Sequence, residues 1–238
     1  MAREAGTRPA LPGGSVESTA SLPHPAGAPP GTKDFWRQEH TKFAAPHYRL
    51  EKTARLINRI SGSRHLDLLD VGCGPATLGR LLHPRIRYFG IDIAVAEPAS
   101  NLREADILDV PIGFDGRRFG IVVSQGVFEY LGGHQEQKLA EIAALLEEDG
   151  IFLATYTNFA HRRPYVYEAF TNIQSIERFR GSLEEHFIVH RAFPTSYNWN
   201  HGQPRRAWVR QANMRFNADL PVLGRRLGVE YFFVCSRS

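Results

Sequence analysis

The chain has 238 residues, of which 42% are hydrophobic and 23% charged, and its formal net charge is +4 at pH 7. This length allows one domain with a full core, and the composition is that of a globular protein. No apolar run approaches the roughly 18 residues of a membrane span. With only Cys73 and Cys235 present, neither a structural disulfide nor a cysteine metal site is expected. Because no basic-then-apolar leader follows Met1, we expect a cytoplasmic protein.

The chain divides into three parts. Residues 1–31 are rich in Pro, Gly, Ala and Ser and predict a disordered tail, since they cannot bury enough apolar surface to offset their ordering entropy. A single domain is expected over residues 32–238. Within it, aromatic and aliphatic residues recur at helical spacing over 32–65, interrupted by Pro46, and predict two short helices. Residues 66–158 are expected to form an α/β core and 159–238 a separate C-terminal region.

Residues 66–82 (LDLLDVGCGPATLGRLL) are the most informative segment. An apolar run ends at Asp70, Gly72-Cys73-Gly74 follows, and an apolar helical pattern comes next. This order predicts a buried parallel strand, a turn of bare backbone and a helix N-terminus, where a small cofactor can bind. A dinucleotide site requires Gly-x-Gly-x-x-Gly, but Thr77 stands at the third glycine position, so the spacing favours a ligand without a pyrophosphate.

Three more predicted strands follow, at residues 88–93, 104–107 and 119–124, each separated from its neighbours by a helical pattern. Acidic, apolar or small residues stand at their C-terminal ends, where a ligand of a parallel sheet binds. These residues are Asp92, Ile93, Asp106, Ile107, Gln125 and Gly126.

A fifth strand is predicted at residues 151–156, after a helix that ends in the turn Asp149-Gly150. Two last strands, 186–193 and 229–236, predict an antiparallel edge hairpin with a long insertion between them. We therefore predict an α/β three-layer sandwich with a seven-stranded, mostly parallel, doubly wound sheet and an antiparallel last strand. Reversal of the strand order beside the first strand would place the ligand at Gly72.

These segments together resemble the class I S-adenosylmethionine (SAM)-dependent methyltransferases. The turn from Asp70 resembles the family's motif I, with Ala76 at its last glycine, and the helices at 32–65 stand where the family often has a helix that closes over SAM. The resemblance implies that Asp92 binds the ribose hydroxyls and Asp106 the adenine amino group, with Ile93 or Ile107 against the ring. The SAM-binding residues that it implies are Asp70, Gly72, Cys73, Gly74, Asp92, Ile93, Asp106, Ile107, Gln125, Gly126 and Arg49. Arg49 would face the SAM carboxylate, or else only pack its helix.

The resemblance also limits the chemistry. The Asn/Asp-Pro-Pro-Tyr/Phe signature of methyltransferases acting on DNA adenine or on release factors is absent, as is the Asp and Asn cluster of the metal-dependent catechol enzymes. We expect metal-independent transfer to an O or N atom of a small molecule, of natural-product, glycan or lipid type. Such a reaction needs at most one base. His161 and His134 are the candidates for this base. Glu129 stands just before His134, after the fourth predicted strand.

Residues Tyr130, Tyr197, Trp199 and His201 are candidates for binding the acceptor, because such side chains can stack on a ring and hydrogen-bond its substituents. The alternative is that the insertion's aromatic residues fill its own small core or a dimer contact.

The last third of the chain is rich in arginine, which predicts either a solvated face or a surface for an anionic substrate. Dense basic stripes with interleaved aromatics are absent, so a nucleic-acid partner is not expected. The alternatives that stay open are an RNA or protein methyltransferase and a SAM-fold protein that catalyses a non-methylating rearrangement. The chain is expected to be a monomer or a homodimer.

Overall fold

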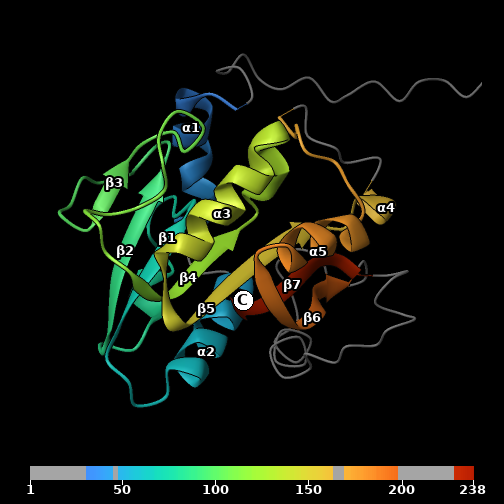
Figure 1. Ribbon diagram of the computed structural model, residues 1–238. Helices are drawn as coiled ribbons and strands as arrows, with labels where there is room; N and C mark the ends of the chain where they lie inside the picture. Colours follow the sequence, from blue (N-terminus) through green and yellow to red (C-terminus); the bar gives the residue numbers. More distant parts are fainter. Residues whose placement is uncertain (1–30, 45–47, 163–168, 198–227) are drawn as a thin grey trace, which may run out of the picture.

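The computed structural model describes residues 31–44, 48–162, 169–197 and 228–238 (Figure 1). Residues 1–30 of the predicted tail, and Trp199 and His201 of the insertion, lie outside the described residues. The helices are α1 (Lys33–Phe43), α2 (Tyr48–Ser61), α3 (Gln135–Leu145), α4 (Phe159–Arg162) and α5 (Ile176–Glu184). The strands are β1 (Leu66–Val71), β2 (Ile86–Asp92), β3 (Leu102–Glu104), β4 (Phe119–Gln125), β5 (Leu146–Thr157), β6 (Phe187–Tyr197) and β7 (Gly228–Arg237).

The seven strands form one sheet in the order β3-β2-β1-β4-β5-β7-β6. Strands β3, β2, β1, β4 and β5 pair in parallel, and β7 runs antiparallel to both β5 and β6. The strand order reverses at β1, which lies between β2 and β4. The predicted fold class, including the antiparallel last strand, is therefore confirmed.

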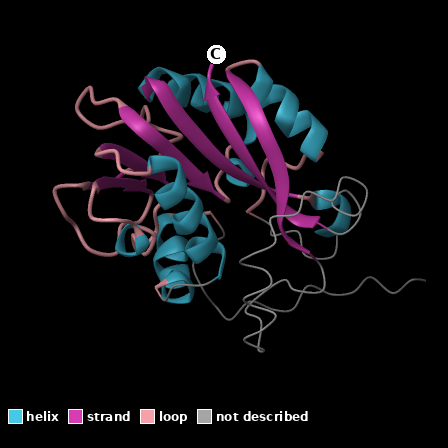
Figure 2. Ribbon diagram, turned by 90° about the horizontal axis from the view of Figure 1, so that it is seen from below, coloured by secondary structure: helices cyan, strands magenta, loops and turns pink. Residues whose placement is uncertain are grey.

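Helices cover both faces of the sheet, with α2 on one side and α3 and α5 on the other (Figures 1 and 2). On the first side, Ala54 and Ile57 of α2 pack against Leu68 of β1. On the second, Leu69 of β1 and Leu139 of α3 belong to one cluster. Because neighbouring strand residues point to opposite faces and both faces are buried, the central strands are apolar runs, which is why the sequence predicted them. No described helix is long and apolar enough to cross a membrane.

The helical pattern after the glycine turn is where the sequence prediction was wrong. The described chain has only a 3-10 turn there, η1 (Gly79–Leu81). A Cβ at Gly79 would lie 2.9 Å from the Tyr88 ring, so the segment packs too closely on β2 for a full helix with side chains on that side. The segment also begins at Pro75 and ends before Pro84, and both residues limit helix length.

The connections from β2 to β3 and from β3 to β4 also lack a helix. Among the connections that join β1 to β5, only the one from β4 to β5 contains an α-helix, which is α3. This contradicts the expectation of a helix in each connection. The short strand predicted at 104–107 lies earlier in the chain, at β3. Its acid Asp106 is two residues past the strand, where its Oδ1 accepts a hydrogen bond from the Leu108 N–H at 2.9 Å and closes a turn.

The turn predicted at Asp149-Gly150 lies within β5 instead. The pairing of β4 with β5 shifts from Phe119 opposite Leu146 to Ile121 opposite Ile151, so residues 147–150 bulge from the ladder. A Cβ at Gly150 would lie 2.9 Å from the Glu147 carbonyl oxygen. The glycine therefore serves a tight bulge rather than a separate turn.

Ala76 has a φ of +53°, in the left-handed region that favours glycine. It stands where the family's motif I has its last glycine. We expect Ala76→Gly to stabilise the protein by about 1 kcal/mol, because relief of backbone strain exceeds the added entropy of the unfolded chain. Urea unfolding monitored by circular dichroism measures the change.

The matched control is Ala140→Gly on the exposed side of helix α3, which should lose about 1 kcal/mol because its backbone is helical. Equal losses in the two variants would contradict the assignment of strain to Ala76.

Candidate active site

A cavity of about 590 Å³ opens at the C-terminal ends of β1, β2 and β4, beside the point where the strand order reverses. This is where ligands of open α/β sheets bind. Helix α1, the turn after β1 and residues 169–171 contribute to its wall. All eleven residues predicted to bind the cofactor line it: Arg49, Asp70, Gly72, Cys73, Gly74, Asp92, Ile93, Asp106, Ile107, Gln125 and Gly126.

Bare backbone forms one wall of the cavity. Gly72, Gly74 and Gly126 all have positive φ values, of +79°, +50° and +65°. A Cβ at Gly72 would lie 2.3 Å from the Val127 Cγ2 atom. Val127 therefore packs against Gly72, whereas a Cβ at Gly74 or Gly126 would lie 3.9 Å from its nearest neighbour, so a ligand can approach the main chain at these two glycines.

Asp92 at the end of β2 holds the glycine turn in place. Its Oδ2 accepts a hydrogen bond from the Gly74 N–H at 2.8 Å, and its Oδ1 accepts one from the Ala94 N–H at 2.8 Å. The Nε2 atom of His40, on α1, lies 3.9 Å from Oδ1. Burial raises the pKa of Asp92, while the two backbone donors and His40 oppose the rise. The carboxylate thus faces the cavity on the side of β2 and β3.

Asp70 is buried at the end of β1, and the Tyr88 hydroxyl donates to its Oδ2 at 2.7 Å. Burial raises the pKa of Asp70 to about 7, and the charge of Asp92 adds to the rise. Burial also raises the pKa of the Cys73 thiol well above its ordinary value. Cys73 is therefore an unreactive packing residue of the turn, because a thiolate is the reactive form.

Helix α1 lies over the cavity, and ion pairs between side chains attach it to the end of β3. Its Lys33 pairs with Glu104, and Arg37 Nη2 lies 3.5 Å from Glu104 Oε2. Two of its side chains, Trp36 and His40, line the cavity. The sequence indicated a covering helix here but not these two residues, which share the ordinary i, i+4 spacing of a helix face.

The other end of the cavity contains two buried acids. Glu129, in the 3-10 turn η2 (Phe128–Tyr130), accepts at Oε1 from the Thr157 N–H and hydroxyl, both at 2.8 Å. Its Oε2 is buried and has no hydrogen-bond partner among the described residues. Glu230 of β7 pairs with Arg49 of α2, with 2.7 Å between Oε1 and Nη2.

Burial raises the pKa of Glu129 to about 7, and the nearby charge of Glu230 adds to the rise, while the bonds from Thr157 oppose it. Burial also lowers the pKa of Lys52, the neighbour of Glu230, to about 8, and Glu230 opposes that change. Glu129 and Lys52 therefore change charge near neutral pH, and both belong to this end of the site.

The candidates for acceptor binding and catalysis are only partly brought together. Tyr130 lines the cavity, in edge-to-face contact with Trp36 at 5.0 Å between ring centroids. Exposed His134, just before α3, does not line it. His161 lies on α4 and Tyr197 at the end of β6, but the side chains of both lie outside the described residues.

Trp36, His40, Phe170 and Glu230 line the cavity but were not predicted to do so. Glu230 had a usable signal, since it is the one acid in the apolar run of residues 229–235. A lone acid in a buried strand needs a partner, and Arg49 is that partner here.

Comparison with known proteins agrees with this geometry. A family model described as a methyltransferase domain matches residues 45–200, more than half of the chain. The chain therefore belongs to the methyltransferase-domain family, and it is a class I SAM-dependent methyltransferase. No curated protein matches the sequence.

Solved structures share the fold at low sequence identity. A TehB-like SAM-dependent methyltransferase from Corynebacterium glutamicum has 19% identity and a TM-score of 0.53, with 86% of this chain and 95% of that chain covered. A putative methyltransferase complexed with the Haloferax volcanii Trm112 activator has 17% identity and a TM-score of 0.60, with the same coverage. The N-methyltransferase NodS from Bradyrhizobium japonicum, in complex with S-adenosyl-L-homocysteine (SAH), has 14% identity and a TM-score of 0.53, covering 85% and 98%.

The residues of the cavity fit SAM. The glycine turn leaves the main chain open, and the acids at the ends of β1 and β2 suit a ligand that carries a sulfonium, an ammonium group and ribose hydroxyls. When bound there, SAM supplies a methyl group on a leaving group that is already activated.

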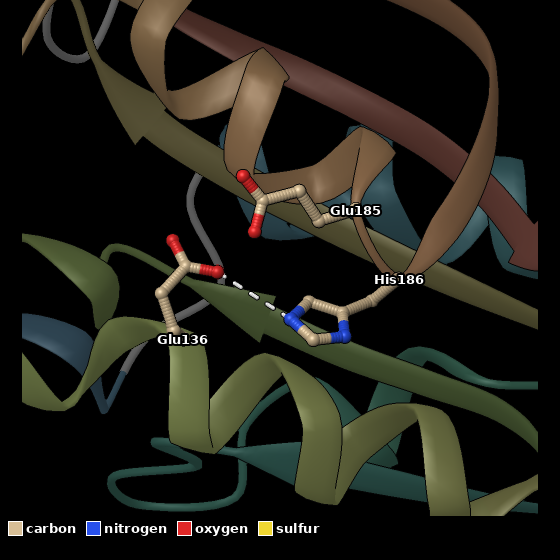
Figure 3. Close-up of side chains that lie close together, drawn as sticks. All are labelled: Glu136, Glu185 and His186. Carbon is tan, nitrogen blue, oxygen red and sulfur yellow. Dashed lines mark ion pairs between the residues drawn. The ribbon is translucent and has the colours of Figure 1, made fainter.

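A second cluster lies away from this cavity, among Glu136 of α3 and the adjacent Glu185 and His186 (Figure 3). Their ligand atoms all lie within 4.8 Å of one another, and His186 Nε2 is 3.4 Å from Glu136 Oε2. Both glutamates are exposed and none of the three lines the cavity. The cluster links α3 to the start of β6.

We expect Asp92→Ala to weaken SAM binding by about 1.5 to 3 kcal/mol, because the variant loses a charged acceptor and frees the Gly74 N–H. Titration calorimetry with SAM measures the change. The control Asp149→Ala removes an exposed acid that pairs with Arg64 and should bind SAM normally. Unchanged affinity in Asp92→Ala would rule out a role for this carboxylate in the cofactor site.

The raised pKa of Glu129 predicts a pH-dependent stability. Below about pH 4.5 the group is protonated in both states, and between 4.5 and about 7 it ionises in the unfolded chain first, so stability falls as pH rises. A tenfold change in proton affinity is worth about 1.4 kcal/mol, so the wild type should lose on the order of 3 kcal/mol relative to Glu129→Gln. Urea unfolding of both proteins without ligand, from pH 5 to pH 8, measures the difference. A difference that does not vary with pH would contradict the raised pKa.

Proposed function

We propose that this methyltransferase transfers the methyl group of SAM, without a metal ion, to an O or N atom of a small molecule. The observation that supports this most is the aromatic end of the cavity. The Tyr130 ring contacts the rings of both Trp36 and Phe170, with centroids 5.0 and 5.1 Å from its own. Aromatic side chains beside a few polar groups are typical of a small-ligand pocket.

The size of the cavity also favours a compact acceptor. Pockets for small molecules measure roughly 300 to 1,000 Å³. A cavity of about 590 Å³ that holds SAM leaves limited room for a second ligand among the described residues. Helix α1 covers it, which suits a small molecule better than an RNA strand or a folded protein. Natural-product, glycan or lipid-type compounds are the acceptors to test first.

In this proposal the two sides of the cavity bind different parts of the ligands. On the β2 and β3 side, Asp92 binds the ribose, Asp106 the adenine amino group, and Ile93 and Ile107 the ring faces. On the β4 and β7 side, Arg49 faces the SAM carboxylate while its other contact is Glu230. The acceptor lies between this side and Trp36. The protein aligns the acceptor with the methyl carbon and removes a proton.

The donor set of the cavity agrees with a metal-independent reaction. Its acids are spread over the ends of β1, β2, β4 and β7, and the Asp92 and Asp70 carboxylates accept hydrogen bonds from Gly74, Ala94 and Tyr88. Among the described residues, the group of three side chains that could bind one metal ion is the cluster at Glu136, outside the cavity.

The test uses tritium-labelled SAM with a cell extract separated into small molecules, RNA and protein. We expect label in the small-molecule fraction, unchanged by a chelator. Trp36→Leu should lower that transfer at least tenfold, mainly through the KM of the acceptor, since it removes a ring of the aromatic end and none of the residues proposed to bind SAM. Calorimetry checks that SAM affinity is kept.

The control Ile188→Ala changes an exposed apolar residue on β6, away from the cavity, and should transfer at the wild-type rate. Label found in RNA or protein instead would favour the macromolecular alternative, and label in no fraction would favour a non-methylating reaction.

A further inference from the structure

We propose that the acceptor is an amine, which binds as an ammonium ion against Glu129, and that Glu129 takes the proton that the nitrogen must lose. This inference rests on the proposed function and names its substrate class. It depends on an incomplete hydrogen-bond arrangement, on the position of Glu129 in the sheet, and on the aromatic rings beside it.

The first argument is the arrangement of donors around Glu129. Oε1 accepts two hydrogen bonds from Thr157, which fix the carboxyl group in one orientation. Oε2 is buried and has no partner among the described residues, although Glu129 lines the cavity. A buried carboxylate oxygen without a donor is costly, and an N–H⁺ group from a ligand would supply that donor.

The second argument is position. The nucleoside-binding acid Asp92 ends β2, on one side of β1, whereas Glu129 follows β4 on the other side. Glu129 is bonded to Thr157 at the end of β5 and lies near Glu230 of β7. It therefore belongs to the half of the cavity where the proposed function places the acceptor rather than the adenosine.

The charged and titratable groups around Glu129 come from three elements. Glu230 of β7 repels its negative charge. Burial raises the pKa of the Tyr156 phenol on β5, and the nearby charge of Glu129 adds to the rise. On α2, Arg49 and Lys52 act on Glu230. The two cations compensate Glu230, so a cationic ligand is the natural counter-charge for Glu129.

The third argument is the set of rings beside Glu129. Its chain neighbour Tyr130 contacts both Trp36 and Phe170. Faces of aromatic rings attract ammonium groups, and rings combined with a carboxylate are a recurrent way to bind an amine. A neutral hydroxyl gains less from both features.

The proton chemistry also favours an amine. With a pKa of about 7, Glu129 can accept a proton from an ammonium group, whose ordinary pKa is roughly 10, but is poorly matched to an alcohol. The ammonium proton passes to the Glu129 carboxylate, which leaves a lone pair on nitrogen. That lone pair forms the N–C bond to the methyl carbon while the C–S bond breaks and its electron pair stays on sulfur. The methylated nitrogen then carries the positive charge that sulfur has lost.

The test compares matched probes by titration calorimetry on SAH-saturated protein at pH 8: 2-phenylethylamine, 2-phenylethanol and 4-methylphenol. We expect the amine to bind at least ten times more tightly than either neutral probe. Its affinity should rise between pH 5.5 and pH 8 as Glu129 ionises, while the affinity of the alcohol stays constant. With SAM in place of SAH, mass spectrometry should find methylated amine.

Glu129→Gln should remove the preference for the amine and keep the affinity for 2-phenylethanol, whereas the control Glu136→Gln should keep the preference. The wild-type comparison of probes needs no variant, so the test stands even if Glu129→Gln fails to fold. Equal binding of amine and alcohol, tighter binding of the phenol, or a preference that survives Glu129→Gln overturns the inference but leaves the small-molecule function in place. Binding of no probe also overturns the inference, while the fraction that receives label from SAM decides the small-molecule function separately.

Discussion

The hydrogen bond from the Gly74 N–H to the Asp92 carboxylate joins the two strand ends at which the large cavity opens. The N–H groups of Gly72 and Cys73 add to it by donating to the Ile91 carbonyl oxygen, at 2.8 and 3.3 Å. Three successive backbone donors thus attach the turn after β1 to the end of β2. This attachment explains how the turn keeps its shape although only a 3-10 turn follows it, because β2 provides the support that a long helix would otherwise give.

The strands and their order could be predicted because burial on both faces leaves apolar runs such as residues 66–71 in the sequence. The absence of a full helix after the glycine turn could not be predicted from local periodicity. Residues 78–82 have helical spacing, yet the ring of Tyr88 occupies the space beside Gly79. That contact joins the β1–β2 connection to β2 itself, and the helical spacing of residues 78–82 does not contain it.

The two halves of the site differ in the same way. The half proposed to bind SAM follows from short motifs, because Asp70, Gly72, Gly74 and Asp92 each stand at a predicted strand end. The half proposed to bind the acceptor is assembled from α1, η2, residues 169–171 and β7, so its contacts join distant parts of the chain. Arg49 and Glu230 are 181 positions apart in sequence. Their pairing depends on the position of β7 beside β5 in the sheet. No pattern of neighbouring residues in the sequence indicates that position.

Helix α1 contacts both halves of the site, through Glu104 at the end of β3 and through Tyr130 after β4. Its ion pairs from Lys33 and Arg37 to Glu104 are solvent-exposed, and pairs of that kind contribute only about 0 to 1 kcal/mol. The buried side chain of Phe35 and the contact of Trp36 with Tyr130 therefore carry most of the attachment. Since Trp36 and Tyr130 also line the cavity, a ligand that packs on these rings adds to the contacts that hold α1. The rings that a ligand would contact are thus the same rings that hold α1 over the cavity.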